Sequence, residues 1–215
     1  MMRYIISILF TFIIVNKSWS QTILNFNPIW NDKGVTTYKI DEFRFYISKV
    51  KFILRNGESI HDLAQAHLLQ IDEKKIPGVV FSQIERERIA SIQLTIGTDS
   101  LMNVSGILDG DLDPILGMYW AWNTGYINTK IEGSLTQNNQ NTQFEYHIGG
   151  YLPPFQTSHE ITLDVSKTNA DINIRIDLDH FLTHVNIENV PSVLIPGKKA
   201  SELSNHFKNS FSIEK

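Results

Sequence analysis

The chain has 215 residues, a formal net charge of −4 and no cysteine. A chain of this length can bury one sizeable core, but without cysteine no disulfide can hold it together. Its fold therefore depends on packing, alone or together with a bound metal ion. The sequence has no run of basic residues, so it predicts neither nucleic acid nor an anionic membrane surface as a partner.

Residues 1–20 predict a secretory signal peptide. Arg3 gives a basic start, residues 4–15 form an apolar run, and Ser20 is a small residue at the expected cleavage site. The run is too short to span a membrane, which takes ~20 residues. We therefore expect a periplasmic or secreted protein with one domain over residues 21–215 and no membrane span after cleavage.

The first half of the expected mature chain predicts β-strands. Residues 22–30 are a candidate first strand. In residues 42–54 the apolar side chains occupy odd positions up to Ile47 and even positions from Val50 onward. This change near Ser48–Lys49 predicts a β-bulge or a strand that crosses between two sheets.

Further strands follow with the same two-residue alternation of apolar and polar side chains. They are predicted over residues 90–97, 126–135, 144–151, 160–166 and 170–180. The polar stretch 136–143 is predicted to be a hairpin loop. Half-buried alternation is typical of antiparallel sheets with one face on a core.

Helical patterns are few and short. Single turns are predicted within residues 82–88 and 179–185, and an amphipathic helix is predicted over residues 198–211, after Pro196–Gly197. The expected fold is therefore all-β: a Greek-key-like antiparallel β-sandwich with a few short helices, including one at the carboxyl end.

An aromatic stretch, "GMYWAWNTGYINTKIEGS", covers residues 117–134. In an extended strand Trp120 and Trp122 would point to the same face. Such a pair can fill one end of a sandwich core, offer a stacking surface, or form the wall of a metal or redox site. Met118 adds a thioether, a soft ligand that suits cuprous ion, or an ordinary core residue.

His147 follows in "FEYHIGGY". Alternation places it on the polar face of its strand, opposite Tyr146, and Gly149 and Gly150 come soon after it. Glycines here allow a ligand or another segment to approach the backbone closely. His147 is a candidate metal ligand, with a hydrogen-bonded surface histidine as the alternative.

His180 and His184 are four residues apart. In a helical turn their imidazoles lie on one face, at a spacing able to bind a transition metal. No third ligand is present in this local motif, so ordinary surface histidines are the alternative.

Asp109, Asp111 and Asp113 alternate in "DGDLDP". Carboxylates at this spacing can bind calcium. The run lacks the closing glutamate of a calcium-binding loop, so a solvated turn ending at Pro114 is the alternative.

No motif of a catalytic centre is present. The sequence has no GxSxG, no HExxH, no cysteine nucleophile and no glycine-rich phosphate loop. We therefore expect a protein that is not an enzyme.

The aromatic stretch followed by "FEYHIGG" resembles the signature of MbnP-like proteins, the periplasmic copper-binding family associated with methanobactin gene clusters. Residues 43–54, 92–103 and 193–211 are also similar to segments of that family. The resemblance extends in order and spacing over nearly all of residues 21–215.

This resemblance implies a secreted β-sandwich that binds copper. In characterised relatives a tryptophan is oxidised to kynurenine by a partner di-haem protein of the cytochrome c peroxidase type, and the modified side chain helps to bind the metal. Carried over to this chain, the resemblance implies that Trp120 or Trp122 is oxidised and that His147 is the imidazole ligand. We prefer Trp122, because it is nearer to the "NTGY" turn.

Two metal-free functions remain open as alternatives. One is a secreted binding module in which Trp120, Trp122 and Tyr126 form an exposed aromatic platform for a glycan or peptide. The other is a structural or interaction role for a sandwich without a metal site.

Overall fold

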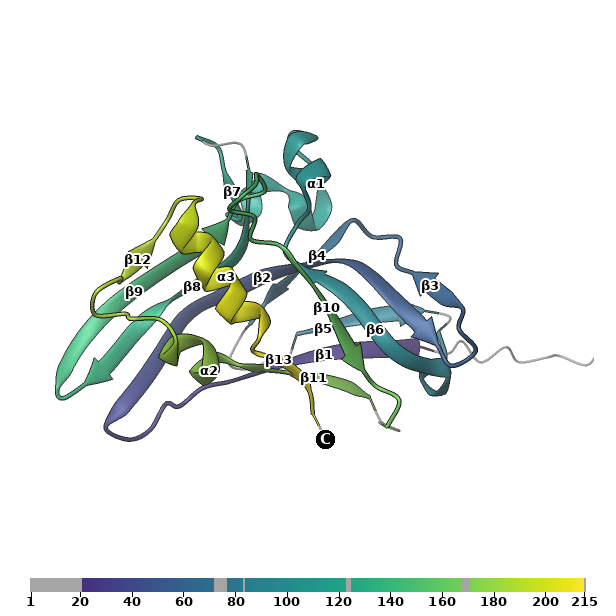
Figure 1. Cartoon of the computed structure of the whole chain (residues 1–215), viewed down its shortest axis with the longest axis horizontal. Coiled ribbons are helices and arrows are strands. Elements are labelled where there is room, and N and C mark those ends of the chain that lie inside the picture. Colours follow the sequence, from purple (N-terminus) through teal and green to yellow (C-terminus); the bar gives the residue numbers. More distant parts are fainter. Residues whose placement is uncertain (1–20, 72–76, 83, 123–124, 168–170, 215) are drawn as a thin grey trace, which may run out of the picture.

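The computed structural model describes residues 21–71, 77–82, 84–122, 125–167 and 171–214. The predicted signal peptide, residues 1–20, lies outside these ranges. Two sheets pack face to face, and α3 lies across the face of the larger sheet between β9 and β10 (Figure 1). The predicted all-β sandwich with few helices is confirmed.

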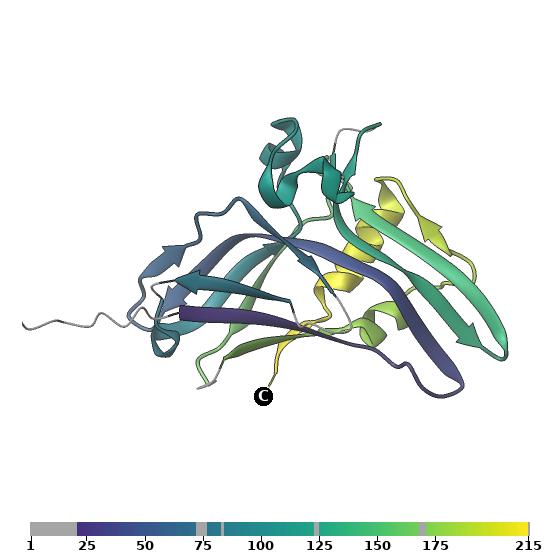
Figure 2. The ribbon, with the colours of Figure 1, turned by 180° about the vertical axis from the view of Figure 1, so that it is seen from behind.

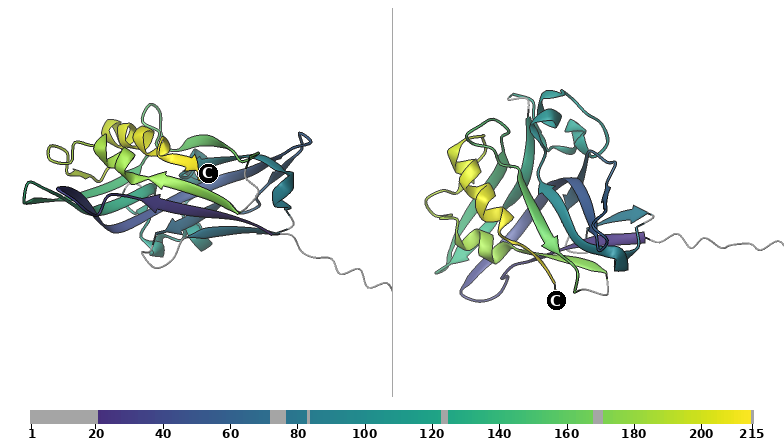
Figure 3. Two further views of the ribbon diagram at one scale, coloured as in Figure 1. Left: turned by 90° about the horizontal axis from the view of Figure 1, so that it is seen from below. Right: turned by 45° about the vertical axis from the view of Figure 1, so that its right-hand side comes forward.

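The smaller sheet has four strands in the order β13-β11-β1-β5. Their bounds are β1 Gln21–Ile29, β5 Gly78–Ser82, β11 Ile172–Asp177 and β13 Phe211–Ile213. The first strand of the described chain, β1, pairs in parallel with the late strand β11 and antiparallel with β5. Strands from both ends of the chain lie side by side beneath the larger sheet (Figure 3).

The larger sheet follows the path β10-β6-β2-β8-β9-β12, with β3 and β4 paired to β2, and β7 paired to β8. The bounds are β2 Thr36–Leu54, β3 Ser59–His61, β4 Ala66–Gln70, β6 Ile89–Ile96, β7 Tyr119–Trp120, β8 Gly125–Gln137, β9 Gln140–Gly149, β10 His159–Asp164 and β12 Ser192–Val193. It is antiparallel apart from the β9–β12 pair. Both parallel pairs join segments far apart in sequence, which explains why local alternation did not predict them.

Six short helical segments connect the strands. They are α1 Ser100–Val104, α2 Leu178–Thr183 and α3 Lys198–Lys208, together with the 3₁₀ turns η1 Arg86–Arg88, η2 Gly110–Leu112 and η3 Pro114–Leu116. The predicted turns at 82–88 and 179–185 and the carboxyl-terminal helix are confirmed. Among the described residues, no helix combines the length and the apolar character that a membrane crossing demands.

The main core lies between the two sheets and under α3. Phe207 of α3 packs edge-on against Phe43 and Phe45 of β2, with ring centroids 5.9 Å apart in both cases. It also contacts Phe181 of α2 at 5.6 Å. The helices α2 and α3 are therefore fixed on the inner face of the larger sheet.

A second, smaller core lies on the outer face of the same sheet. It contains Tyr46, Ala66, Met102, Leu112, Met118, Trp120, Tyr126 and Ile127. The segment carrying α1, η2, η3 and β7 covers it and rises above one end of the sheet (Figure 2). This end carries the aromatic stretch.

Two local predictions can be compared directly with the structure. The register of β2 against β6 shifts between Ser48 and Lys51, and Lys49 has a positive φ of 52°, so the predicted bulge is confirmed. The predicted eight-residue loop 136–143 is wrong in extent. The strands continue to Gln137 and from Gln140, and a two-residue turn joins them, because asparagine tolerates the left-handed conformation that such turns require.

The aromatic contacts of Phe207 predict that α3 depends on this side chain. Phe207→Ala should lower the free energy of unfolding by about 3–5 kcal/mol, since it leaves a cavity among packed rings. The measurement is chemical denaturation, with unfolding monitored by tryptophan fluorescence. Asn205→Ala, at an exposed position of the same helix, is the matched control. If Phe207→Ala lowered the free energy of unfolding by less than about 1 kcal/mol, which is about the contribution of one buried methylene group, the role given to this ring would be contradicted.

Candidate functional site

The two tryptophans of the aromatic stretch differ sharply in burial. Trp120 is 6% exposed, whereas Trp122 is 64% exposed. Strand β7 ends at Trp120, and Trp122 lies in the turn that follows, so the predicted extended strand does not reach Trp122. Their rings are nevertheless neighbours, with centroids 5.9 Å apart. One ring belongs to the outer core and the other lies at the surface directly beside it.

Trp120 packs onto the carboxyl end of β9. A Cβ atom at Gly149 would lie 2.6 Å from Cζ3 of Trp120 and 2.5 Å from the carbonyl oxygen of Tyr126. Only glycine leaves room for the indole there. Residues 147 and 149 point to the same face of β9, roughly 7 Å apart along the strand. The indole of Trp120 therefore lies over Gly149, two residues beyond His147 on the outer face of β9.

His147 is held by a carboxylate. Its Nε2 lies 2.8 Å from Oε1 of Glu132 on the adjacent strand β8, and its side chain is 21% exposed. Burial raises the pKa of Glu132, but the hydrogen bonds from His147 and Lys130 outweigh it and leave the pKa below its ordinary value. Glu132 is thus a carboxylate that can only accept, so Nε2 donates the proton of this hydrogen bond, and in the neutral imidazole the lone pair is on Nδ1.

The pair belongs to a row of charges across the outer face. Lys130 Nζ lies 3.0 Å from both Glu132 and Glu42, and Glu42 in turn pairs with Arg44. Arg44 donates to the carbonyl oxygen of Leu116 at 2.5 Å. The row connects His147 to the segment just before Met118. Such partly exposed pairs each contribute little to stability, but together they orient the imidazole relative to the aromatic stretch.

Beneath the site lies a buried network of polar side chains. Asn128 Oδ1 accepts hydrogen bonds from the backbone N–H and the hydroxyl of Thr98, both at 2.8 Å. Asn128 Nδ2 donates to Thr157 Oγ1 at 2.9 Å, and Thr157 donates to the carbonyl oxygen of Gly150 at 3.1 Å. The network therefore ties the ends of β6, β8 and β9 together.

The same network reaches the aromatic hairpin through Asn103. Its Nδ2 donates to Thr98 Oγ1 at 3.0 Å, and its Oδ1 accepts from the backbone N–H of Tyr126 at 2.8 Å. Gly97 makes this possible, because a Cβ at that position would lie 2.6 Å from Cγ of Asn128. These buried hydrogen bonds thus fix the backbone of the β7–β8 hairpin, which carries Trp120.

The remaining candidate residues lie in three different settings. Met118 is fully buried in the outer core, close in sequence to Trp120. His180 and His184 lie together on α2 and its carboxyl-terminal cap, with ring centroids 4.6 Å apart. They are on the inner side of the larger sheet, so the structure does not bring them to His147.

The three aspartates do not converge. Asp111 accepts a hydrogen bond from the backbone N–H of Leu68 at 2.9 Å, and Asp113 caps η3 by accepting from Ile115 at 2.9 Å. Asp109 is exposed before η2. In the part of the chain that the structure describes, no three histidine, aspartate or glutamate side chains form a ready group for a metal ion.

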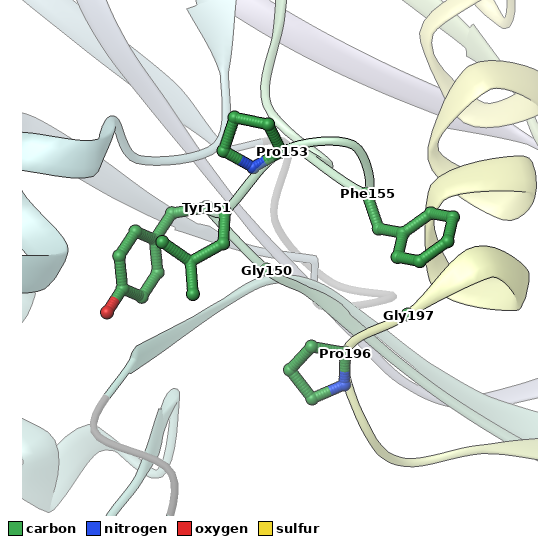
Figure 4. Close-up of a pocket in the computed structure, with 7 residues that line it drawn as sticks. Gly150, Tyr151, Pro153, Phe155, Pro196 and Gly197 are labelled. Atoms are coloured by element: carbon green, nitrogen blue, oxygen red, sulfur yellow. The ribbon is translucent and has the colours of Figure 1, made fainter.

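An apolar pocket of about 170 Å³ opens directly after the end of β9. Figure 4 shows Phe155 and Pro196 on the side of α3, with Tyr151 on the other side. Gly150 forms part of its wall and also accepts the hydrogen bond from Thr157. The pocket thus begins at Gly150, directly after Gly149, on which Trp120 packs.

Sequence reasoning identified the tryptophans and His147 but missed Glu132, Asn103 and Asn128. Glu132 sits opposite Glu145 in the ladder, two pairs away from His147, and a strand alignment of "TKIEG" with "EYHIG" could have found it. No sequence signal marks the two asparagines, because their partners come from three separate segments.

Known proteins can now be compared with this geometry. A family model described as MbnP matches residues 10–195. The chain belongs to the MbnP family. Among solved structures, MbnP from Methylosinus trichosporium is similar in fold, with a TM-score of 0.53 and 13% identity over 77% of this chain and 78% of that one. No curated protein matches the chain. The MbnP assignment confirms the resemblance that the aromatic stretch predicted.

The polar network predicts that the site depends on Asn128. Asn128→Ala leaves the backbone N–H and the hydroxyl of Thr98 without their acceptor, and each buried unsatisfied group costs about 1–3 kcal/mol. We expect a loss of unfolding free energy of at least about 1 kcal/mol, together with faster hydrogen exchange at Tyr126. Asn141→Ala, at an exposed position of β9, is the control. Unchanged exchange at Tyr126 would contradict the role of the network.

Proposed function

We propose that this MbnP family member is a periplasmic copper-binding protein, whose site is formed by His147 and the tryptophan pair. The observation that supports it most is the position of the Trp120 indole over Gly149, two residues beyond His147 on the same face of β9. Imidazole and aniline-type nitrogens are ligands that suit copper better than calcium or magnesium. The identity of the metal is inferred from the family resemblance, and its candidate ligands are inferred from the geometry of the site.

Glu132 acts as the positioning residue of this site. A metal-binding histidine usually donates its second ring N–H to a carboxylate, which fixes the tautomer and the ring orientation. The Glu132–His147 pair has this arrangement, so Nδ1 of His147 is the nitrogen that would bind copper. Lys130 shares the carboxylate and keeps it ionised.

Trp122 is the side chain we propose for oxidation to kynurenine. Its 64% exposure makes it accessible to a haem partner of the cytochrome c peroxidase type, whereas Trp120 is enclosed. The indole C2–C3 bond breaks as two oxygen atoms add, while two equivalents of peroxide are reduced to water at the partner's haem. Hydrolysis then releases formate and leaves an aryl amine beside the neighbouring ring.

Replacing His147 tests the metal site. His147→Ala should weaken copper binding by at least ~10-fold, and Glu132→Gln should weaken it by ~10-fold or more through loss of ring orientation. Competition titration against a chromophoric copper chelator measures both. His61→Ala, at an exposed position of β3, is the matched control. Equal affinity in His147→Ala and the control would contradict the proposed ligand.

The position of the modification is tested separately. Trp122→Phe should abolish the kynurenine mass shift in protein purified from its native host, whereas Trp120→Phe should retain it. Intact mass and peptide mapping measure this directly. The reverse pattern would assign the oxidation to the buried ring and contradict the argument from exposure.

A metal-free binding role is the second candidate. Trp120 and Tyr126 are buried, so the three rings do not form one exposed aromatic platform. The observation that favours a binding role is instead the apolar pocket beside Phe155 and Pro196 (Figure 4). Tryptophan fluorescence that responds to an apolar probe such as a naphthalene sulfonate, and not to copper, would favour this candidate.

A further inference from the structure

We propose that His180, His184 and His206 form a second site, which binds a divalent transition-metal ion on the inner side of the sandwich. The ring centroids of His180 and His184 are 4.6 Å apart, and those of His184 and His206 are 5.2 Å apart. Two imidazoles bound to one ion at ~2.0–2.1 Å from each nitrogen place their ring centroids roughly 4.5–5.5 Å apart. Two of the three ring pairs, those that involve His184, already have the separation that such a site requires.

A rigid platform carries the three histidines. His180 lies on α2, His184 caps the same helix, and His206 lies in the last turn of α3. The residues next to them, Phe181 and Phe207, are buried and pack edge-on at 5.6 Å. The two backbones are thus fixed relative to each other at the point where the imidazoles meet.

His184 is held in a form that can bind a metal. Its Nδ1 lies 2.6 Å from the backbone carbonyl oxygen of His180. A carbonyl can only accept, so Nδ1 donates the proton of this hydrogen bond, and in the neutral imidazole the lone pair is on Nε2. A ring N–H donated to a backbone carbonyl is a common second interaction of metal-binding histidines.

The surroundings favour a bound cation. The carboxylate of Glu202 lies one turn earlier on α3, where it pairs with Lys199 at 3.1 Å, and the carboxyl end of the eleven-residue helix adds partial negative charge.

Binding needs the rings to turn. The rings of His184 and His206 stack at an interplanar angle of 25°, so their nitrogens do not point at one position. The ring torsion of histidine is broad, and His180 is exposed and His206 half-buried. Rotation of these two rings, with His184 keeping its hydrogen bond, completes the site.

This site is distinct from the one proposed for copper. Phe207, next to His206, contacts Phe43 and Phe45 on the inner face of β2, whereas His147 points to the outer face. Three imidazoles follow the usual order of divalent affinity, with Cu²⁺ above Zn²⁺. Zinc is the better probe, because it undergoes no redox change.

The test uses the full mature chain with His147→Ala, so that the outer site cannot contribute. Zinc titration against a competing chelator near neutral pH should show one bound equivalent. In this background, His184→Ala should weaken zinc binding by more than ~10-fold, the loss expected when only an outer-shell partner of a metal ligand is removed. The triple variant, which carries His180→Ala, His184→Ala and His206→Ala in the same background, should bind no equivalent of zinc. His61→Ala in the same background is the matched control and should change nothing.

Two results would overturn the proposal. One is a His147→Ala chain that binds no zinc at micromolar concentration. The other is a triple variant that keeps the full equivalent, which would place the metal elsewhere. Circular dichroism of each variant checks that the fold is retained, which we expect because His180 and His184 are exposed. Failure here leaves the copper titration of His147 unaffected, since the two sites share no residue.

Discussion

The buried side chain of Asn128 is the constraint on which the outer site depends. It lies where β6 ends against β8, and its amide satisfies Thr98 on one side and Thr157 on the other. Through Asn103 the same network fixes the backbone of the aromatic hairpin. An unsatisfied polar group at this depth would cost more than any single ion pair on the surface contributes. The network therefore allows few arrangements of the segments that carry Trp120 and the end of β9.

Two faces of one sheet then have different roles. The inner face of β2, β8 and β9 is covered by the phenylalanine core and α3, which provides most of the hydrophobic stabilisation. The outer face carries a small second core with Trp120 at its edge, a row of charges ending at His147, and an exposed Trp122. Alternation along each strand makes this division possible, because neighbouring residues such as Tyr146 and His147 point in opposite directions.

Much of this was predictable from the sequence. Alternation predicted the strands and the outward direction of His147, the change of parity predicted the bulge near Lys49, and the aromatic stretch indicated the family. The burial difference between Trp120 and Trp122 was not predictable, since it depends on where β7 ends. Glu132 and Asn128 act through partners distant in sequence, and His206 meets His184 only because Phe181 and Phe207 pack together.

The most direct measurement of the central claim is metal analysis combined with intact mass, made on protein purified from its native host grown with copper. We expect copper bound at the outer site and a mass shift that peptide mapping assigns to Trp122. Such a result would support one metal centre that contains both Trp122 and His147. Protein without copper and with both tryptophans unmodified would contradict the claim.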